Sequence, residues 1–160
     1  MEFTETTKHG VTLITNKPKI DESRMRLLES RIGCGLPEDY REFLMLHNGG
    51  RPIERGFQFV MRNGKHSNSV IDWFLSLHDG EASNLESCLE NLEDRIPPDV
   101  LPIARDPFGN VVLIGLRGGA RGKVYFWDHE EEPDSQPDWS NIDRIADSFD
   151  AFMSGLKPSP

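Results

Sequence analysis

Asp128, His129 and Glu130 are the residues whose types best suit chemistry, because they are consecutive and combine an imidazole with two carboxylates. Such groups serve in general acid–base catalysis and in metal binding. Consecutive polar residues at the end of an expected strand more often form a solvated turn. The five histidines and two cysteines show no C-x-x-C or H-x-x-x-H spacing, which metal sites commonly use. We therefore predict no metal site, no cofactor and no catalytic residues.

The segment from Arg117 to Lys123 is rich in glycine and basic residues, which could cradle a phosphate. A P-loop has the pattern G-x-x-x-x-G-K-[ST] and lies between a strand and a helix. Here Val124 follows the lysine, and the next expected element is a strand. The chain also lacks the G-x-S-x-G nucleophile motif. We interpret the segment as a hairpin loop and expect the protein not to be an enzyme.

Acidic residues are unevenly distributed in this chain, whose net charge is −9. Residues 66–94 and 124–143 each hold seven acidic residues and no Lys or Arg. Removing these fourteen from the 27 acidic residues leaves 13 against 18 basic residues, so the remainder carries +5. A phosphate-binding surface needs positive charge, so we expect no direct binding to nucleic acid or to an anionic membrane. The pattern permits a basic protein partner, although acidic surfaces commonly serve solubility.

Residues 130–138 form an acidic segment between aromatic residues, with Tyr125 and Trp127 before it and Trp139 after it. Carboxylates beside exposed aromatic side chains could hold a basic protein surface, because charges speed encounter and buried aromatics supply affinity. The alternative is that the two tryptophans belong to the core and the loop is merely solvated. The candidate partner-binding residues are Glu130, Glu131, Glu132, Asp134, Asp138 and Trp139, with Asp79 and Glu81 from the other acidic stretch.

The helices that must position these residues follow from caps and apolar periodicity. Asp21 is a suitable N-cap for a first helix, and Gly33 is suited to its end. Pro37 begins a second helix, because its fixed φ and missing N–H are tolerated there. The residues Asn48-Gly49-Gly50 accept positive φ and end that helix. The positions expected on the inner faces are Met25, Leu28, Ile32, Leu36, Tyr40, Phe43, Leu44 and His47.

Two further helices are expected. A capping-box pattern at residues 83–86 starts one, which Pro97-Pro98 cannot continue. Asp147 or Ser148 caps the other near the C-terminus.

The N-terminus lacks a signal-peptide pattern, no apolar run could cross a bilayer, and both cysteines are expected to be reduced, so we predict a cytoplasmic protein.

The remaining apolar segments predict strands joined by short turns, and Asp106, Gly109 and Asn110 fit one such turn. Short connections favour antiparallel pairing. We predict an α+β fold: a single domain with helices packed on one face of a mainly antiparallel five- or six-stranded sheet, and a C-terminal helix that closes the core. Residues 1–19 would be an arm or edge strand, 20–156 the domain and 157–160 a frayed tail. The expected strands are residues 11–14, 56–59, 69–77, 101–105, 111–116, 123–129 and 141–146.

Several of these segments occur in a recognisable order. They are Ile32-Gly33, Leu36-Pro37, Asp39-Tyr40, Phe43-Leu44, Asn48-Gly49-Gly50, residues 101–106, Gly109-Asn110, residues 124–130 and residues 145–152. In this order they resemble the SUKH superfamily, in the branch related to fungal cell-wall-assembly regulators of the Smi/Knr type. The resemblance covers about residues 20–156. It implies that these motif residues are mainly structural and that there is no family active site to transfer.

The resemblance also implies a function. Bacterial members are largely inferred to be immunity proteins that neutralise polymorphic toxins, often nucleases, whereas fungal relatives are scaffold-like signalling regulators. We expect a non-catalytic module that binds a cognate toxin domain, basic at the contact, and the oligomeric state stays open between monomer and weak dimer. The alternatives are a regulator or scaffold in the cell's own signalling or cell-wall assembly, and an uncharacterised hydrolase.

Overall fold

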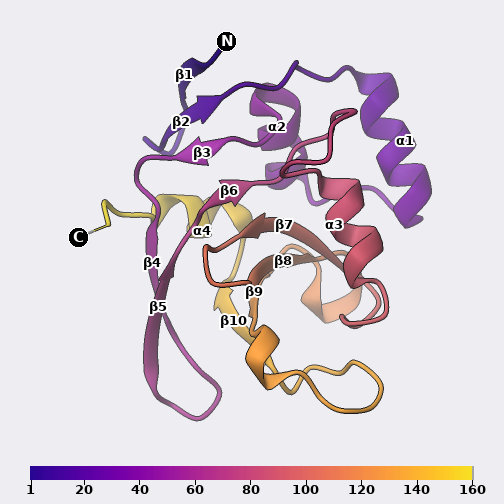
Figure 1. The fold of residues 1–160 in the computed structure, drawn as a ribbon, viewed down its shortest axis with the longest axis vertical. Coiled ribbons are helices and arrows are strands. Elements are labelled where there is room, and N and C mark those ends of the chain that lie inside the picture. The colour runs from indigo at the N-terminus through magenta and orange to yellow at the C-terminus, as the bar shows by residue number, and fades with distance from the viewer. Residues whose placement is uncertain (160) are drawn as a thin grey trace.

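The computed structural model describes residues 1–159, which form one α+β domain, as predicted (Figure 1). The helices are α1 (Glu22–Ile32), α2 (Glu38–His47), α3 (Leu85–Leu92) and α4 (Phe149–Ser154), with short 3-10 turns η1 (Gly118–Ala120) and η2 (His129–Glu131). The strands are β1 (Phe3–Thr6), β2 (Thr12–Thr15), β3 (Arg51–Pro52), β4 (Gly56–Val60), β5 (His66–Val70), β6 (Trp73–Phe74), β7 (Val100–Arg105), β8 (Val111–Gly115), β9 (Val124–Trp127) and β10 (Ile142–Ala146).

The strands are divided among three antiparallel sheets, so the five- or six-stranded sheet that we expected is accompanied by two smaller ones. The main sheet has the order β10-β9-β8-β7-β6, a second has the order β1-β2-β3, and β4 pairs with β5 as a hairpin. The prediction of one strand over residues 69–77 was wrong. The chain changes partner there, because Ile71 N–H bonds to Arg55 while Asp72 N–H bonds to Arg105 on β7.

Both faces of the main sheet are buried. One face packs with α1, α2 and α4 in the larger core, and the C-terminal helix closes it through Phe149, Phe152 and Met153. The opposite face carries a smaller core, which Leu92 of α3 and Ile96 cover. The helices therefore cover more than the one face that we expected. This arrangement explains why β8 and β9 are apolar without alternation, as strands covered on both sides are.

The predicted helix ends are mostly confirmed. Asp21 caps α1, Gly33 ends it with φ 82°, and Asn48 ends α2 with φ 53°. The expected cap of α3 was wrong by one residue. The cap is Asn84, whose side chain accepts from Ser87 N–H at 3.0 Å, while Ser83 takes φ 52° outside the helix.

The Asn48-Gly49-Gly50 motif joins α2 to the sheets. The buried Asn48 side chain bonds the backbone of Pro18 and Leu77. A Cβ at Gly49 would lie 2.5 Å from the Leu75 carbonyl oxygen, so only glycine fits between these backbones. Gly50 exchanges backbone hydrogen bonds with Phe74 and thereby links the second sheet to the main one. The motif is structural, as the resemblance implied.

The ends of the chain are held by backbone pairing. Residues 1–19 contain β1 and β2, which form a hairpin, and β2 also pairs with β3. At the other end, Lys157 exchanges two backbone hydrogen bonds with Gly56, at 2.8 and 2.9 Å. The fraying expected for residues 157–160 therefore does not begin at Lys157, and Pro160 lies outside the described residues.

Candidate functional site

The acidic loop of residues 130–138 connects β9 to β10 and lies at the end of the molecule opposite α1 and α2 (Figure 1). Glu130, Glu131, Asp134 and Asp138 are exposed. Glu132 is half-buried and forms an ion pair of 2.5 Å with Arg95, just beyond α3. The loop is thus tied to the body of the protein at Glu132 and presents its other carboxylates to solvent.

The aromatic residues beside this loop are not exposed, so that part of the prediction was wrong. Trp127 is 1% exposed and Tyr125 is 9% exposed, because both belong to the smaller core. Trp139 is half-buried and packs edge-on against Tyr125, with ring centroids 4.9 Å apart. Burial raises the pKa of the Tyr125 hydroxyl. The alternative that Trp127 is a core residue is therefore the correct one.

A rigid turn lies beside the acidic loop instead. Asp106 is 5% exposed, and its carboxylate accepts four hydrogen bonds, all between 2.8 and 2.9 Å. The donors are Phe108 N–H, Asn110 N–H, the Asn110 amide and the Ser69 hydroxyl. These contacts confirm the predicted turn between β7 and β8. The side chain of Phe108 is 67% exposed at its tip.

His129 joins this turn to the acidic loop. Its backbone N–H donates to Asn110 Oδ1 at 3.1 Å, and its ring Nε2 lies 2.8 Å from the Phe108 carbonyl oxygen. Asp128 accepts from Glu130 N–H at 3.0 Å and so caps η2. The side chains of Asp128 and His129 are thus engaged with backbone groups, whereas the Glu130 side chain is exposed, and the solvated-turn interpretation describes these residues.

A groove of about 290 Å³ runs between α3 and the strand ends, and Arg95 and Arg105 line it together with residues from both acidic stretches. Glu81 lines it from one stretch, and His129 lines it where the other begins. Cys88 also lines the groove, and burial raises the pKa of its thiol to about 11. Trp139 does not share this groove, because it lines a separate depression with Arg62 and Arg144.

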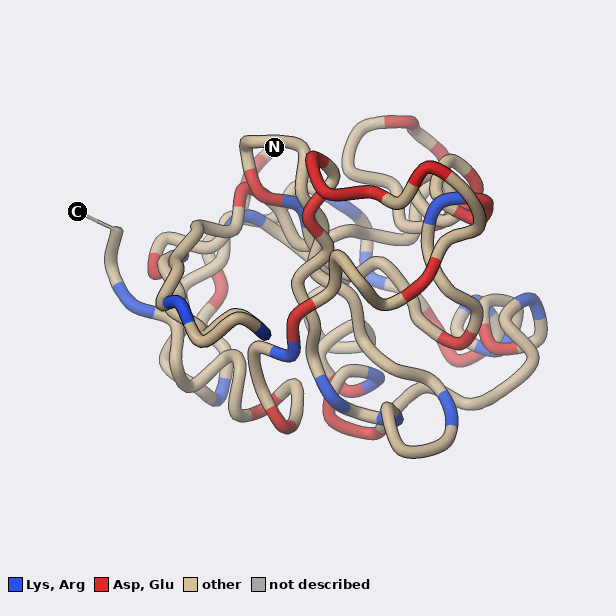
Figure 2. Tube along the Cα trace, turned by 90° about the horizontal axis from the view of Figure 1, so that it is seen from below, with Lys and Arg blue, Asp and Glu red and all other residues tan. Residues whose placement is uncertain are grey.

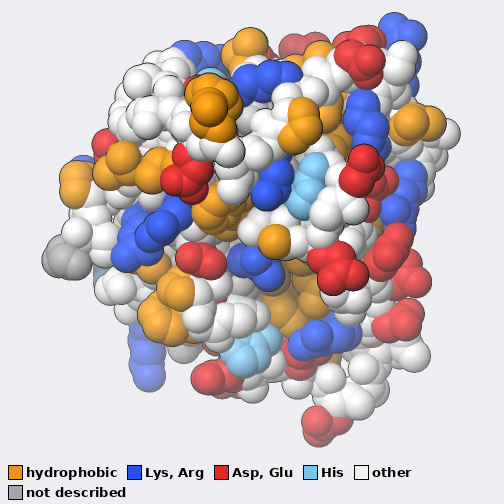
Figure 3. Space-filling view, turned by 45° about the horizontal axis from the view of Figure 1, so that its top comes forward, with side chains coloured by type: hydrophobic (Ala, Val, Ile, Leu, Met, Phe, Trp, Pro, Cys, Tyr) orange, Lys and Arg blue, Asp and Glu red, His pale blue; other side chains and the backbone are white. Residues whose placement is uncertain are grey.

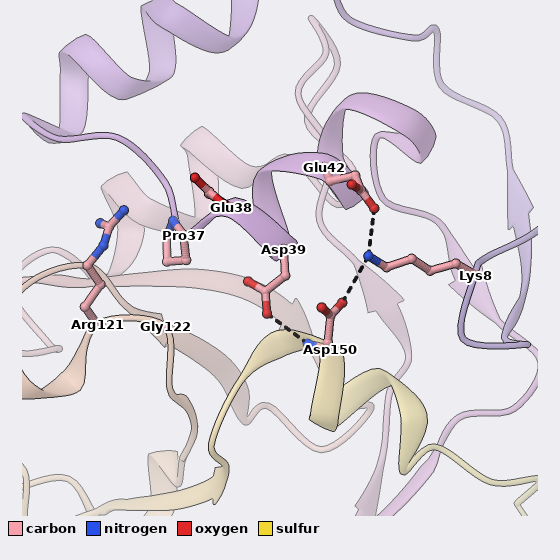
Figure 4. A pocket seen from close by; sticks show the side chains of 8 residues that line it. All are labelled: Lys8, Pro37, Glu38, Asp39, Glu42, Arg121, Gly122 and Asp150. Atoms are coloured by element: carbon pink, nitrogen blue, oxygen red, sulfur yellow. Dashed lines mark hydrogen bonds and ion pairs between the residues drawn. The ribbon is translucent and has the colours of Figure 1, made fainter.

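A second, more open depression of about 620 Å³, which no sequence pattern predicted, lies at the start of α2 (Figure 4). Lys8 pairs with Glu42 at 2.9 Å and with Asp150 at 3.7 Å. Asp39 accepts from the backbone N–H of Asp150 at 3.0 Å. The charged groups here hold the N-terminal hairpin, α2 and α4 together, so we assign them a structural role.

The glycine-rich basic loop connects β8 to β9, as predicted. Arg117 donates to the Ile32 carbonyl oxygen and Arg121 to that of Gly35, each at 2.8 Å. The Lys123 ammonium donates to the Gly119 carbonyl oxygen at 2.7 Å. These three basic side chains donate hydrogen bonds to main-chain carbonyl oxygens and do not surround an open anion site.

Acidic positions are concentrated in parts of the molecule, whereas exposed apolar side chains are scattered. Acidic positions predominate along the loop between β9 and β10 and near the end of α3 (Figure 2). On the face shown in Figure 3, apolar side chains are scattered among charged ones. Within residues 1–159, no helix is long and apolar enough to span a bilayer, and no three His, Cys, Asp or Glu side chains group as metal ligands.

Comparison with known proteins agrees with this architecture. Residues 19–155 match the model of the SMI1 / KNR4 family (SUKH-1). The SPbeta prophage-derived uncharacterized protein YokK of Bacillus subtilis (strain 168) is 28% identical over 154 residues, which span 86% of this chain and 74% of that relative. The family match includes α1, the Asn48-Gly49-Gly50 motif, the β-meander and α4. The chain belongs to the SMI1 / KNR4 family (SUKH-1).

Proposed function

We propose that this protein is a non-catalytic immunity protein that binds and neutralises a toxin domain with a basic contact surface. Family membership supports the class of function, through the resemblance to bacterial immunity proteins. The observation that carries the proposal is the group of exposed carboxylates within residues 130–138, which follow directly on His129 at the edge of a groove that Glu81 of the other acidic stretch also lines.

The charges on this surface are free to act on a partner. Within residues 1–159, no ion pair links Glu130, Glu131, Asp134 or Asp138 to a basic side chain, nor does one link Asp79 or Glu81. Hydrogen bonds from Ser140 lower the pKa of the exposed Asp138 carboxylate. A concentration of unpaired negative charge steers a basic partner and speeds association.

This chemistry fits a nuclease toxin in particular. A nuclease holds phosphate groups with Arg and Lys, and carboxylates can compete for the same side chains. An immunity protein that covers such a surface needs no catalysis, because occupancy alone blocks the substrate. As part of this proposal, we place the protein in the cytoplasm, where nucleic acid would need protection.

The proposal is tested with any candidate toxin domain that is encoded beside this gene. Cells that express the toxin should survive when this chain is co-expressed, and the purified proteins should form a one-to-one complex by isothermal titration calorimetry. Absence of both rescue and binding would contradict the proposal. A growth defect on deletion of the gene in cells without a toxin would instead indicate a regulator of the cell's own signalling.

A further inference from the structure

We propose that Phe108 is the apolar anchor of the partner-binding surface and that it inserts into an apolar pocket with a basic rim on the toxin. This inference rests on the proposed function and names the residue that supplies most of the affinity. It also replaces the buried Tyr125 and Trp127 as the aromatic component of the site.

Phe108 is unusual among the aromatic residues of this protein. Seven of the nine phenylalanines are buried, whereas Phe108 is 67% exposed and Phe3 is 58% exposed. The Pro107 and Gly109 that flank Phe108 are also exposed. The ring therefore stands at the tip of a turn, where a partner can surround it.

The backbone beneath this ring is held in place before any partner binds. The buried Asp106 carboxylate accepts from Phe108 N–H at 2.9 Å, and His129 Nε2 lies 2.8 Å from the Phe108 carbonyl oxygen. Both backbone groups of the anchor residue are thus occupied by the protein itself. A preorganised backbone loses little conformational freedom on association, and an aromatic side chain has few torsions to restrict.

The neighbours of this turn determine the chemistry of the partner. His129 begins η2, and the next two residues, Glu130 and Glu131, are exposed. The contacts of His129 join the backbone of the aromatic tip to the start of the acidic loop, so the ring and these carboxylates lie on one connected surface. Aromatic anchors in interfaces commonly fill a desolvated pocket that is surrounded by polar contacts. The complement of this unit is an apolar pocket rimmed by Arg or Lys.

The experiment compares Phe108→Ala with Leu27→Ala, which removes a side chain of similar exposure (64%) on α1. Binding to the toxin domain is followed by surface plasmon resonance at low and high salt. We expect Phe108→Ala to weaken binding by about 30-fold or more, mainly through faster dissociation and equally at both salt concentrations. Leu27→Ala should bind like the unaltered protein, and urea unfolding should show both variants folded.

Each outcome separates the anchor from the proposed function. If the unaltered protein binds the toxin and Phe108→Ala binds with an affinity within about twofold of the unaltered protein's, the assignment of Phe108 as anchor is wrong, whereas the proposed function is retained. If the unaltered protein does not bind, both are wrong. Loss of self-association in Phe108→Ala, with toxin binding unchanged, would assign the ring to a second copy and also overturn the inference. Phe108→Leu, which should retain part of the affinity, provides the same comparison if the alanine variant does not fold.

Discussion

Asn48 and Leu77, 29 residues apart in the chain, exchange two hydrogen bonds through the Asn48 side chain. Asn48 Nδ2 donates to the Leu77 carbonyl oxygen at 2.9 Å, and Leu77 N–H donates to Asn48 Oδ1 at 2.9 Å. The same amide donates to the Pro18 carbonyl oxygen at 2.8 Å. One buried side chain thus holds the end of α2, the segment before α1 and the segment after β6.

Asn48→Ala should lower the free energy of unfolding by about 3 kcal/mol, because it leaves buried backbone groups without partners. Urea unfolding followed by circular dichroism measures the change. Asn68→Ala, at an exposed position of β5, should change it by less than about 0.5 kcal/mol. Similar losses in the two variants would show that burial of the Asn48 amide is not the cause.

Gly49→Ala should prevent folding or destabilise the protein by more than about 4 kcal/mol, since the new methyl group would overlap main-chain oxygens of Phe74 and Leu75. Gly64 provides a matched control, with φ +84° against +79° at Gly49 and open space around it. Gly64→Ala should therefore lower the free energy of unfolding by only about 1–2 kcal/mol, the cost of placing alanine in the left-handed backbone conformation. Equal effects in thermal unfolding would exclude the close approach as the reason for Gly49.

Reversing Glu130 and Glu131 together to lysine should slow association with the toxin about tenfold at low salt. Glu132 is left unaltered because it pairs with Arg95. The difference should shrink as salt screens the charges, while the dissociation rate stays nearly constant. Stopped-flow mixing measures both rates. Glu2→Lys with Glu38→Lys changes the net charge equally at other exposed positions, and an equal slowing there would mean that overall charge alone matters.

Glu29 should make stability depend on pH in the acid range. Burial alone would raise the pKa of Glu29, but hydrogen bonds from Arg41 and from Leu36 N–H outweigh it and lower the pKa. The folded state therefore gains stability from this carboxylate above the unfolded pKa of about 4.3, and it loses that stability as the pH falls through the lower folded value.

Glu29→Gln should accordingly be less stable at pH 7 and should lose less stability between about pH 5 and pH 3. Urea unfolding at a series of pH values measures this slope. Arg41→Gln removes the partner that lowers the pKa, so the folded value moves toward the unfolded one and this variant should also lose less stability in acid than the unaltered protein. A slope unchanged in both variants would show that Glu29 does not contribute.

Much of the fold could be predicted from residues that act locally. The caps at Asp21 and Ser148, the left-handed Asn48 and the glycine turns of the meander depend on neighbouring backbone, so periodicity and turn chemistry were sufficient. β1 was missed because three of its four residues are polar and it becomes a strand only by pairing with β2.

The site was harder to predict because burial at β9 depends on distant segments. Tyr125 and Trp127 are covered by Leu92, Ile96 and Ile142, and nothing in the local sequence shows that these would meet there. The continuous apolar run of β8 was the available signal for a sheet covered on both faces. The exposure of Phe108 could have been predicted from the sequence. An aromatic residue between Pro107 and Gly109 lies in a tight turn, where no helix or strand covers it.

Arg117 and Arg121 affect how survival screens of this protein should be interpreted. Both guanidinium groups clamp the connection between α1 and α2 to the β8–β9 loop. Alanine at either position would reduce the pool of folded protein in the cell, and protection would decline with it. A screen scored by survival alone would assign these arginines to toxin recognition. Measuring protein abundance in parallel would show that they act by stabilising the folded protein.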